Sequence, residues 1–265
     1  MVRGMSEQHG DIFVSRDGQI AILEIRRPPN NHASVEIMRH LANALHIIDR
    51  EREIRASVLC SQGKNFCAGA DFSSSTPLGG GGTGQEDTVQ LYDEAARLFS
   101  AKKPIVAAVQ GAAVGAGLGL ALVADFRVAA PEARFVANFV KLGFHPGFGL
   151  TYTLPRLIGA QRAALMCLTG RRIKAEEALD WGLVDQVVGA KGLRDAALSL
   201  AREIAENGPL GVEATRASLR EGLVAAVRAH TQREHAQQAR LRTTNDFQEG
   251  INAVRERRPG NFTGT

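Results

Sequence analysis

Two stretches of small residues decide the fold of this chain: FCAGAD at residues 66–71 and QGAAVGAGLG at residues 110–119. Each follows a short apolar run, at 57–60 and at 105–109, of the kind that forms a buried strand. Where a strand passes into Gly and Ala, no side chain covers the backbone N–H groups. If the two turns converge, those N–H groups can bind a developing negative charge, as an oxyanion hole does. The pattern favours acyl chemistry.

The composition is that of an ordinary soluble globular protein. The 265 residues are 44% hydrophobic and 23% charged, with a formal net charge of +4 and a pI near 9.2. This length allows one sizeable core, or a core with a small helical appendage. Because no long Lys/Arg run is present, the basic excess indicates a mildly basic cytosolic protein rather than a nucleic-acid-binding one, and a phosphate-bearing small ligand fits that excess equally well.

The cysteines and the N-terminal residues indicate a cytoplasmic location. Cys60, Cys67 and Cys167 are odd in number and form no C-x-x-C pair, which argues against a disulfide framework or a metal site. Cys67 is interpreted as a small packed thiol. Residues 1–11 are polar and carry no secretory signal. The apolar stretch 104–124 contains Gln110 and several glycines, which predicts a strand, a turn and a short helix rather than a membrane span.

The remaining pattern predicts an α/β chain built from repeated strand–turn–helix units. Strands are expected at 12–14 and 19–25, and a helix whose apolar residues repeat at helical spacing follows Ser34. A Gly/Ser-rich loop at 73–84 is either a neutral insertion or a flap beside the first turn. Beyond about residue 190 the chain is expected to be almost wholly helical. We therefore predict a core over 1–195 and a C-terminal helical segment over 196–265. Such a segment packs either on the core or on a partner chain, and we expect it to serve oligomerisation.

At this point the chain resembles the crotonase superfamily, also called the enoyl-CoA hydratase/isomerase family. The resemblance covers essentially the whole chain and is carried by motifs in a fixed order: NFCAGAD at 65–71, KPIVAAVQG at 103–111, GAGLGLAL at 115–122, LTGRRI at 168–173, ALDWGLVD at 178–185, FQEG at 247–250 and ERRP at 256–259. It implies the family's spiral core of repeated ββα units with a C-terminal helical segment. It also implies a homotrimer or a dimer of trimers whose C-terminal helices cover a neighbour's site.

The resemblance further implies a CoA thioester as ligand, with no separate cofactor, metal, nucleic acid or membrane partner. The oxyanion hole would be formed by the backbone N–H groups of Ala70 and Ala116, the latter opening a helix. The adenine would lie near the Arg27-Pro28 turn and the Ala68 backbone. Arg27 and Arg257 are expected either to contact the CoA phosphates or to be solvated surface arginines.

The acid–base positions of the family are vacant in this chain. The two glutamates that hold water in hydratases correspond to Gly119 and Phe139, and the aspartate of related isomerases corresponds to Gly147. Neither a hydrogen atom nor a phenyl ring can accept a proton, so the residues do not support hydration by a glutamate pair. With Phe148, Phe139 is instead expected to line an apolar acyl pocket.

Three accounts of the chemistry remain open. In the first account, another side chain acts as the acid or base. His145 is the first candidate, although it can instead have a purely structural role. Tyr92, Glu94 and Asp71 are weaker candidates. Asp71 is also counted among the substrate-binding candidates, although it can simply cap its turn. The oxyanion hole can also act alone, with the substrate or an ion supplying the base.

In the third account, the protein binds acyl-CoA without turning it over. Our sequence-based prediction is an enzyme of fatty acyl-CoA metabolism that stabilises a thioester enolate, for double-bond isomerisation or a related enolate-type step. Hydration and non-catalytic binding are the alternatives.

Overall fold

The computed structural model describes residues 7–70 and 85–265. Its larger sheet has the strand order β1-β2-β3-β4-β5-β7-β10. The first three strands are antiparallel and the pairs from β3 onward are parallel. The strands are β1 (Glu7–His9), β2 (Ile12–Asp17), β3 (Ile20–Ile25), β4 (Ala56–Ser61), β5 (Ile105–Val109), β7 (Phe126–Ala129) and β10 (Gln186–Val187).

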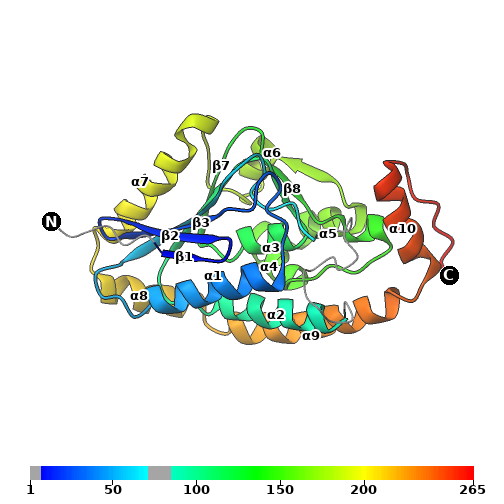
Figure 1. Ribbon diagram of the computed structural model, residues 1–265, viewed down its shortest axis with the longest axis horizontal. Coiled ribbons are helices and arrows are strands. Elements are labelled where there is room, and N and C mark those ends of the chain that lie inside the picture. The colour runs from blue at the N-terminus through cyan, green and yellow to red at the C-terminus, as the bar shows by residue number, and fades with distance from the viewer. Residues whose placement is uncertain (1–6, 71–84) are drawn as a thin grey trace.

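Alternating apolar residues along these strands build a core on each face of the sheet. Ile22 and Val58 point toward α7 (Leu193–Ala205), whereas Leu23 and Leu59 point toward the opposite face, which α1 (Val35–Ile48) and α2 (Gln85–Phe99) cover. Figure 1 shows α7 apart from α1 and α2, with the sheet between them. The mixed α/β fold predicted from the sequence is confirmed.

A second, smaller sheet was not predicted. It consists of β6 (Ala112–Val114), β8 (Arg134–Val136) and β9 (Arg172–Lys174), and β6 lies inside the stretch that the sequence suggested was one continuous turn. The true turn is at Gly115, whose φ of 55° suits glycine. The short helix α3 (Ala116–Ala121) begins directly after it.

The remaining helices surround the two sheets and extend to the C-terminus. They are η1 (Asn138–Leu142), α4 (Leu150–Ile158), α5 (Ala160–Thr169), α6 (Ala175–Asp180), η2 (Ala190–Gly192), α8 (Pro209–Leu219), α9 (Leu223–Leu241) and α10 (Asn245–Glu256). The predicted boundary after residue 195 falls inside α7, which packs on the sheet, and the two-part division stays a prediction. Among the described helices, none combines the length and the apolar character needed to cross a membrane.

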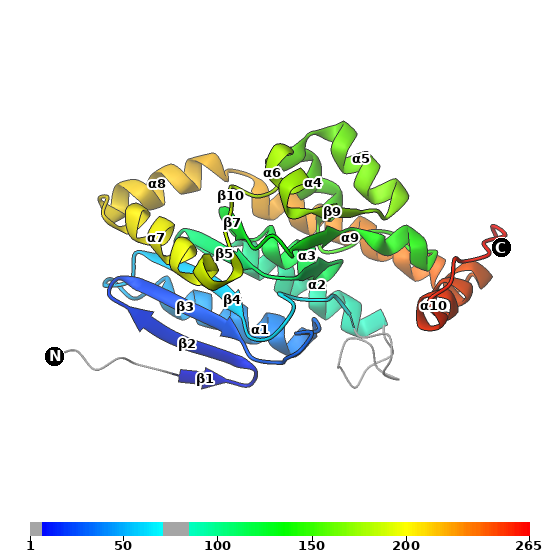
Figure 2. The same cartoon turned by 90° about the horizontal axis from the view of Figure 1, so that it is seen from above.

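The C-terminal helices pack on their own chain. Helix α9 lies along α2, and α10 packs on η1 at the end of the molecule farthest from the N-terminal strands (Figures 1 and 2). Gly250 permits this contact, because a Cβ there would come within 2.4 Å of the Leu142 backbone. Phe247 also stacks on Phe144, with ring centroids 4.8 Å apart. Ile251, Val254 and Arg255 of α10 line a pocket of their own chain, and the expectation that the C-terminal helices cover a neighbour's site stays a prediction.

A buried carboxylate ties α9 to the first turn of α4. Glu234 is fully buried and accepts hydrogen bonds from the backbone N–H groups of Gly149 (2.7 Å) and Thr151 (3.0 Å) and from the Thr151 hydroxyl (2.6 Å). These contacts satisfy N–H groups that a helix start leaves unpaired. They hold the turn at residues 146–149 in place beside the cavity described below.

Glu234 predicts a pH dependence of stability. Burial raises the pKa of Glu234 from 4.5 to about 7, against the lowering effect of its hydrogen bonds to Thr151 and Gly149. The folded chain therefore binds this proton more tightly than the unfolded chain does. The resulting stabilisation is complete below about pH 4.5 and is lost as the pH rises to about 7. Relative to Glu234→Gln, the wild-type free energy of unfolding should fall by about 3 kcal/mol across that window. Urea denaturation at several pH values measures it, and parallel pH curves for the two proteins would contradict it.

Candidate active site

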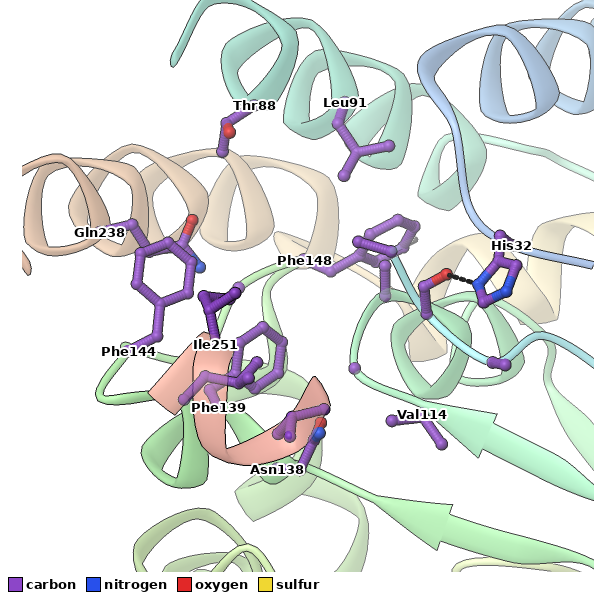
Figure 3. A pocket seen from close by; sticks show the side chains of 18 of the residues that line it. His32, Thr88, Leu91, Val114, Asn138, Phe139, Phe144, Phe148, Gln238 and Ile251 are labelled. Atoms are coloured by element: carbon purple, nitrogen blue, oxygen red, sulfur yellow. Dashed lines mark hydrogen bonds between the residues drawn. The ribbon is translucent and has the colours of Figure 1, made fainter. Parts of the chain in front are cut away.

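A cavity of about 320 Å³ opens between the two stretches that decide the fold and the C-terminal helices. Its walls come from residues 68–70, from the β6–α3 junction, from η1 and the turn that follows it, and from α2, α9 and α10. Figure 3 shows aromatic rings inside it, with Phe139, Phe144 and Phe148 labelled. The cavity is thus largely apolar, as a site for an acyl chain requires.

Backbone hydrogen bonds bring the two small-residue stretches together. The N–H of Phe66 donates to the carbonyl of Gln110 (2.8 Å), that of Cys67 to Ala112 (3.0 Å), and that of Val114 back to Cys67 (3.0 Å). Gly117 is needed for this approach, because a Cβ there would lie 2.0 Å from the Cys67 carbonyl oxygen. The convergence expected from the sequence is present.

Ala70 and Ala116 both line the cavity. Ala116 is the first residue of α3, where the N–H has no partner within the helix. Within the described part of the chain, neither N–H donates a hydrogen bond to another residue. The Ala70 N–H belongs to the same peptide group as the Gly69 carbonyl, which accepts from the Ala33 N–H (2.9 Å) and faces Nδ1 of His32 at 3.2 Å. These contacts fix the direction of the Ala70 N–H.

Other groups fill the space of the family's missing carboxylates. A Cβ at Gly119 would lie 2.4 Å from the Phe148 ring, and a Cβ at Gly147 would lie 1.8 Å from the Tyr92 hydroxyl. Position 139 carries a phenyl ring that itself lines the cavity. Of the described residues that line the cavity, none is Asp or Glu. The site therefore has no carboxylate pair in its described part.

The structure does not bring His145 into the cavity. Its side chain is half-buried outside the lining, and Nδ1 lies 2.7 Å from the Pro146 carbonyl oxygen. This position agrees with the alternative that His145 has a structural role and takes no part in catalysis. Glu94 is also outside the cavity and forms ion pairs with Arg39 and Arg97. Asp71 and the 73–84 loop lie outside the described residues, so their predicted roles stay predictions.

The predicted substrate-binding residues divide into two groups. Ala68 and Phe139 line the cavity. Arg27 does not: its side chain is 48% exposed, with Nε 3.9 Å from Asp11. Arg257 ends α10 as an exposed residue, also outside the lining. Phosphate contact by the two arginines stays a prediction.

Sequence reasoning missed most of the polar groups in the cavity. His32 lies at one end, with its ring hydrogen-bonded to the Gly69 carbonyl (Figure 3). In the interior, the Tyr92 hydroxyl donates to Oε1 of Gln238 (2.7 Å), and Nε2 of Gln238 donates to the His145 carbonyl (2.8 Å). Burial raises the pKa of Tyr92 well above its ordinary value, so the phenol stays protonated at neutral pH. Tyr92 is a minor candidate on sequence grounds, and no sequence motif points to His32 or Gln238.

Comparisons with known proteins agree with the geometry. The model of the enoyl-CoA hydratase/isomerase family matches residues 15–265. The chain is 33% identical over 249 residues to the 1,2-epoxyphenylacetyl-CoA isomerase of Escherichia coli (strain K12), covering 92% of this chain and 95% of that protein. It is also 33% identical over 255 residues to the 2,3-dehydroadipyl-CoA hydratase of the same strain, covering 96% and 99%.

Among solved structures, an enoyl-CoA hydratase from Mycobacterium avium subsp. paratuberculosis K-10 superposes with a TM-score of 0.84 at 26% identity. That match covers 97% of this chain and 100% of the other. The family model, the sequence relatives and the fold all agree with the resemblance found in the motifs. The chain belongs to the enoyl-CoA hydratase/isomerase family, within the crotonase superfamily.

Proposed function

We propose that this protein binds an acyl-CoA and stabilises its thioester enolate, in order to move a double bond along the acyl chain. The observation that carries the proposal is the pair of N–H groups, at Ala70 and Ala116 on one apolar cavity, that have no hydrogen-bond partner among the described residues. Such donors favour a thioester oxygen that gains negative charge. Hydration is disfavoured because Phe148 and Tyr92 occupy the space of two missing carboxylates.

Elimination among the cavity side chains that the structure describes points to His32 as the proton carrier. Tyr92 is held protonated, and the guanidinium groups of Arg242 and Arg255 do not lose their protons at neutral pH. Because Nδ1 of His32 faces a carbonyl oxygen, it must carry the hydrogen, which leaves the lone pair of the neutral ring on Nε2. Imidazole is the side chain best suited to exchange protons near neutral pH.

The reaction that we propose needs one base, and it neither consumes nor releases a proton overall. Nε2 of His32 takes a proton from C2 of a 3-enoyl-CoA, and the electron pair moves onto the thioester oxygen, where the two N–H groups stabilise it. The imidazolium then returns the proton to C4, the double bond re-forms between C2 and C3, and the product is a 2-enoyl-CoA. Both of the E. coli relatives named above act on CoA thioesters, according to their names.

A panel of CoA thioesters tests the proposed function. Purified protein is incubated with 3-enoyl-CoA and with 2-enoyl-CoA, and the products are identified by mass spectrometry and by absorbance of the conjugated thioester. We expect conversion of the 3-enoyl to the 2-enoyl form at an enzymatic rate, ~1–10³ per second, with water addition near background. Water addition as the dominant reaction would reverse the assignment. Tight binding without product would favour the non-catalytic alternative.

We also propose that the chain assembles as a homotrimer or a dimer of trimers in the cytoplasm. Helix α8 supports an assembly, because Leu210 and Leu219 on it are 81% and 69% exposed in the single chain. Large apolar side chains left in water are typical of surfaces that a partner subunit covers.

A further inference from the structure

The cavity has chemically different ends. His32, Ala70 and Ala116 mark the end where the thioester is proposed to bind. Figure 3 shows Thr88, Gln238 and Phe144 on the side away from His32. Arg242, at the end of α9, lines the cavity there and donates a hydrogen bond from Nη2 to the Thr88 hydroxyl (2.9 Å). The end far from the oxyanion donors therefore carries a positive charge.

The charge of Arg242 is only partly solvated. The side chain is partly buried, and its guanidinium lies 5.0 Å from the centre of the Phe144 ring and 5.8 Å from that of Phe247. Burial lowers the pKa of Arg242 below its ordinary value, which reflects the lost hydration of the charged group. The aromatic rings compensate in part through cation–π contact.

The buried Arg127 and Arg216 and the partly buried Arg220 each have a carboxylate partner. Among the described residues Arg242 has none, as is also the case for the partly buried Arg55 and Arg134, whose guanidinium groups donate to backbone carbonyls instead. Arg127 lies 3.6 Å from Asp185, and both Arg216 and Arg220 contact Asp125, at 2.9 and 3.1 Å. In the described part of the chain, no carboxylate forms an ion pair with Arg242. A desolvated guanidinium without an anion is costly, and a bound anion relieves that cost.

The surroundings indicate which anion fits. Between the two ends the walls are apolar, formed by Phe139, Phe148, Leu91 and Ile251, which suits an alkyl chain. We propose that Arg242 binds a carboxylate at the far end of the acyl chain, so that the preferred ligand is the CoA monothioester of a dicarboxylic acid. This inference rests on the proposed acyl-CoA site and adds its substrate class. A guanidinium holds a carboxylate through paired N–H donors, and the phosphates of CoA are the competing anion.

Matched ligands test the assignment by calorimetric titration. Adipyl-CoA and hexanoyl-CoA have the same carbon count and differ in a terminal carboxylate or methyl group. Shorter and longer pairs (succinyl and butyryl, glutaryl and pentanoyl, suberyl and octanoyl) find the chain length that reaches Arg242. In the wild type, the carboxylate member of at least one pair should bind about tenfold tighter or more, as expected for charge-assisted hydrogen bonds.

Variants then identify the residue responsible. Arg242→Gln should abolish this preference and leave the affinities for the methyl-terminated ligands and for CoA alone within about twofold. Arg242→Lys should keep part of it. Arg240→Gln, an exposed residue on the same helix and outside the cavity, should keep all of it. The wild-type measurement stands even if a variant does not fold.

Three outcomes would overturn the inference: no pair shows a carboxylate preference, the preference survives Arg242→Gln, or the variant weakens CoA alone by the same factor, which would assign Arg242 to the phosphates. In each of these cases methyl-terminated thioesters still bind and the proposed function stands. If no CoA thioester binds at all, both the inference and the proposed function fail.

Discussion

Replacing His32 with glutamine is expected to slow isomerisation of a 3-enoyl-CoA by about 10²–10⁴-fold, the range typical of a lost general base. The glutamine amide keeps a polar side chain that can donate a hydrogen bond, although its Nε2 is one bond farther from the backbone than Nδ1 of His32, which faces the Gly69 carbonyl. It has no lone pair that accepts a proton at neutral pH. The loss should therefore fall on kcat, while the affinity for a non-reactive acyl-CoA stays unchanged.

The same substitution at His145 is the matched control. His145 lies outside the cavity, so His145→Gln should retain nearly all activity. Equal activity of His32→Gln and wild type would remove His32 from the mechanism.

Replacing Ala116 with proline is expected to lower turnover by about 10²–10³-fold, because proline has no N–H and one oxyanion donor is lost. The first position of a helix tolerates proline well, since its N–H has no helical partner and the ring presets a helical φ. The ring would occupy the place where the N–H faces the cavity. The damage should therefore be local and chemical rather than a loss of the fold.

Ala116→Gly provides the control for that variant. Glycine keeps the N–H and removes only one methyl group, so most activity should remain. Circular dichroism and thermal unfolding of both variants check that α3 is intact. If Ala116→Pro folds and turns substrate over at the wild-type rate, the Ala116 N–H is not an oxyanion donor.

The fold was predictable from the sequence because its signals are local. Alternating apolar residues in the strands and glycines in the two turns reflect burial and close backbone approach, as the Gly117 contact with Cys67 shows. Strand β6 was missed because three small residues carry no periodicity, and its identity depends on pairing with β8.

The polar groups of the site were not predictable in the same way. Tyr92 and Gln238 are 146 residues apart in the chain, and only the packing of α9 on α2 brings them together. The position of Arg242 in the cavity, beside Thr88 of α2, depends on the same packing of α9 on α2. His145 is near the vacant Gly147 in sequence, but its ring lies outside the cavity. No sequence motif singles out His32, whose place in the cavity depends on the fold.

The central claim is that two backbone N–H groups stabilise a thioester enolate in a site without a described carboxylate. The direct measurement is solvent exchange at C2: an acyl-CoA is incubated with the protein in D₂O and its deuterium content is followed by mass spectrometry. We predict deuterium uptake at C2 that the wild type catalyses and that Ala116→Pro and His32→Gln each suppress. An acyl-CoA that binds the wild type tightly, yet takes up deuterium no faster than in buffer alone, would contradict the account.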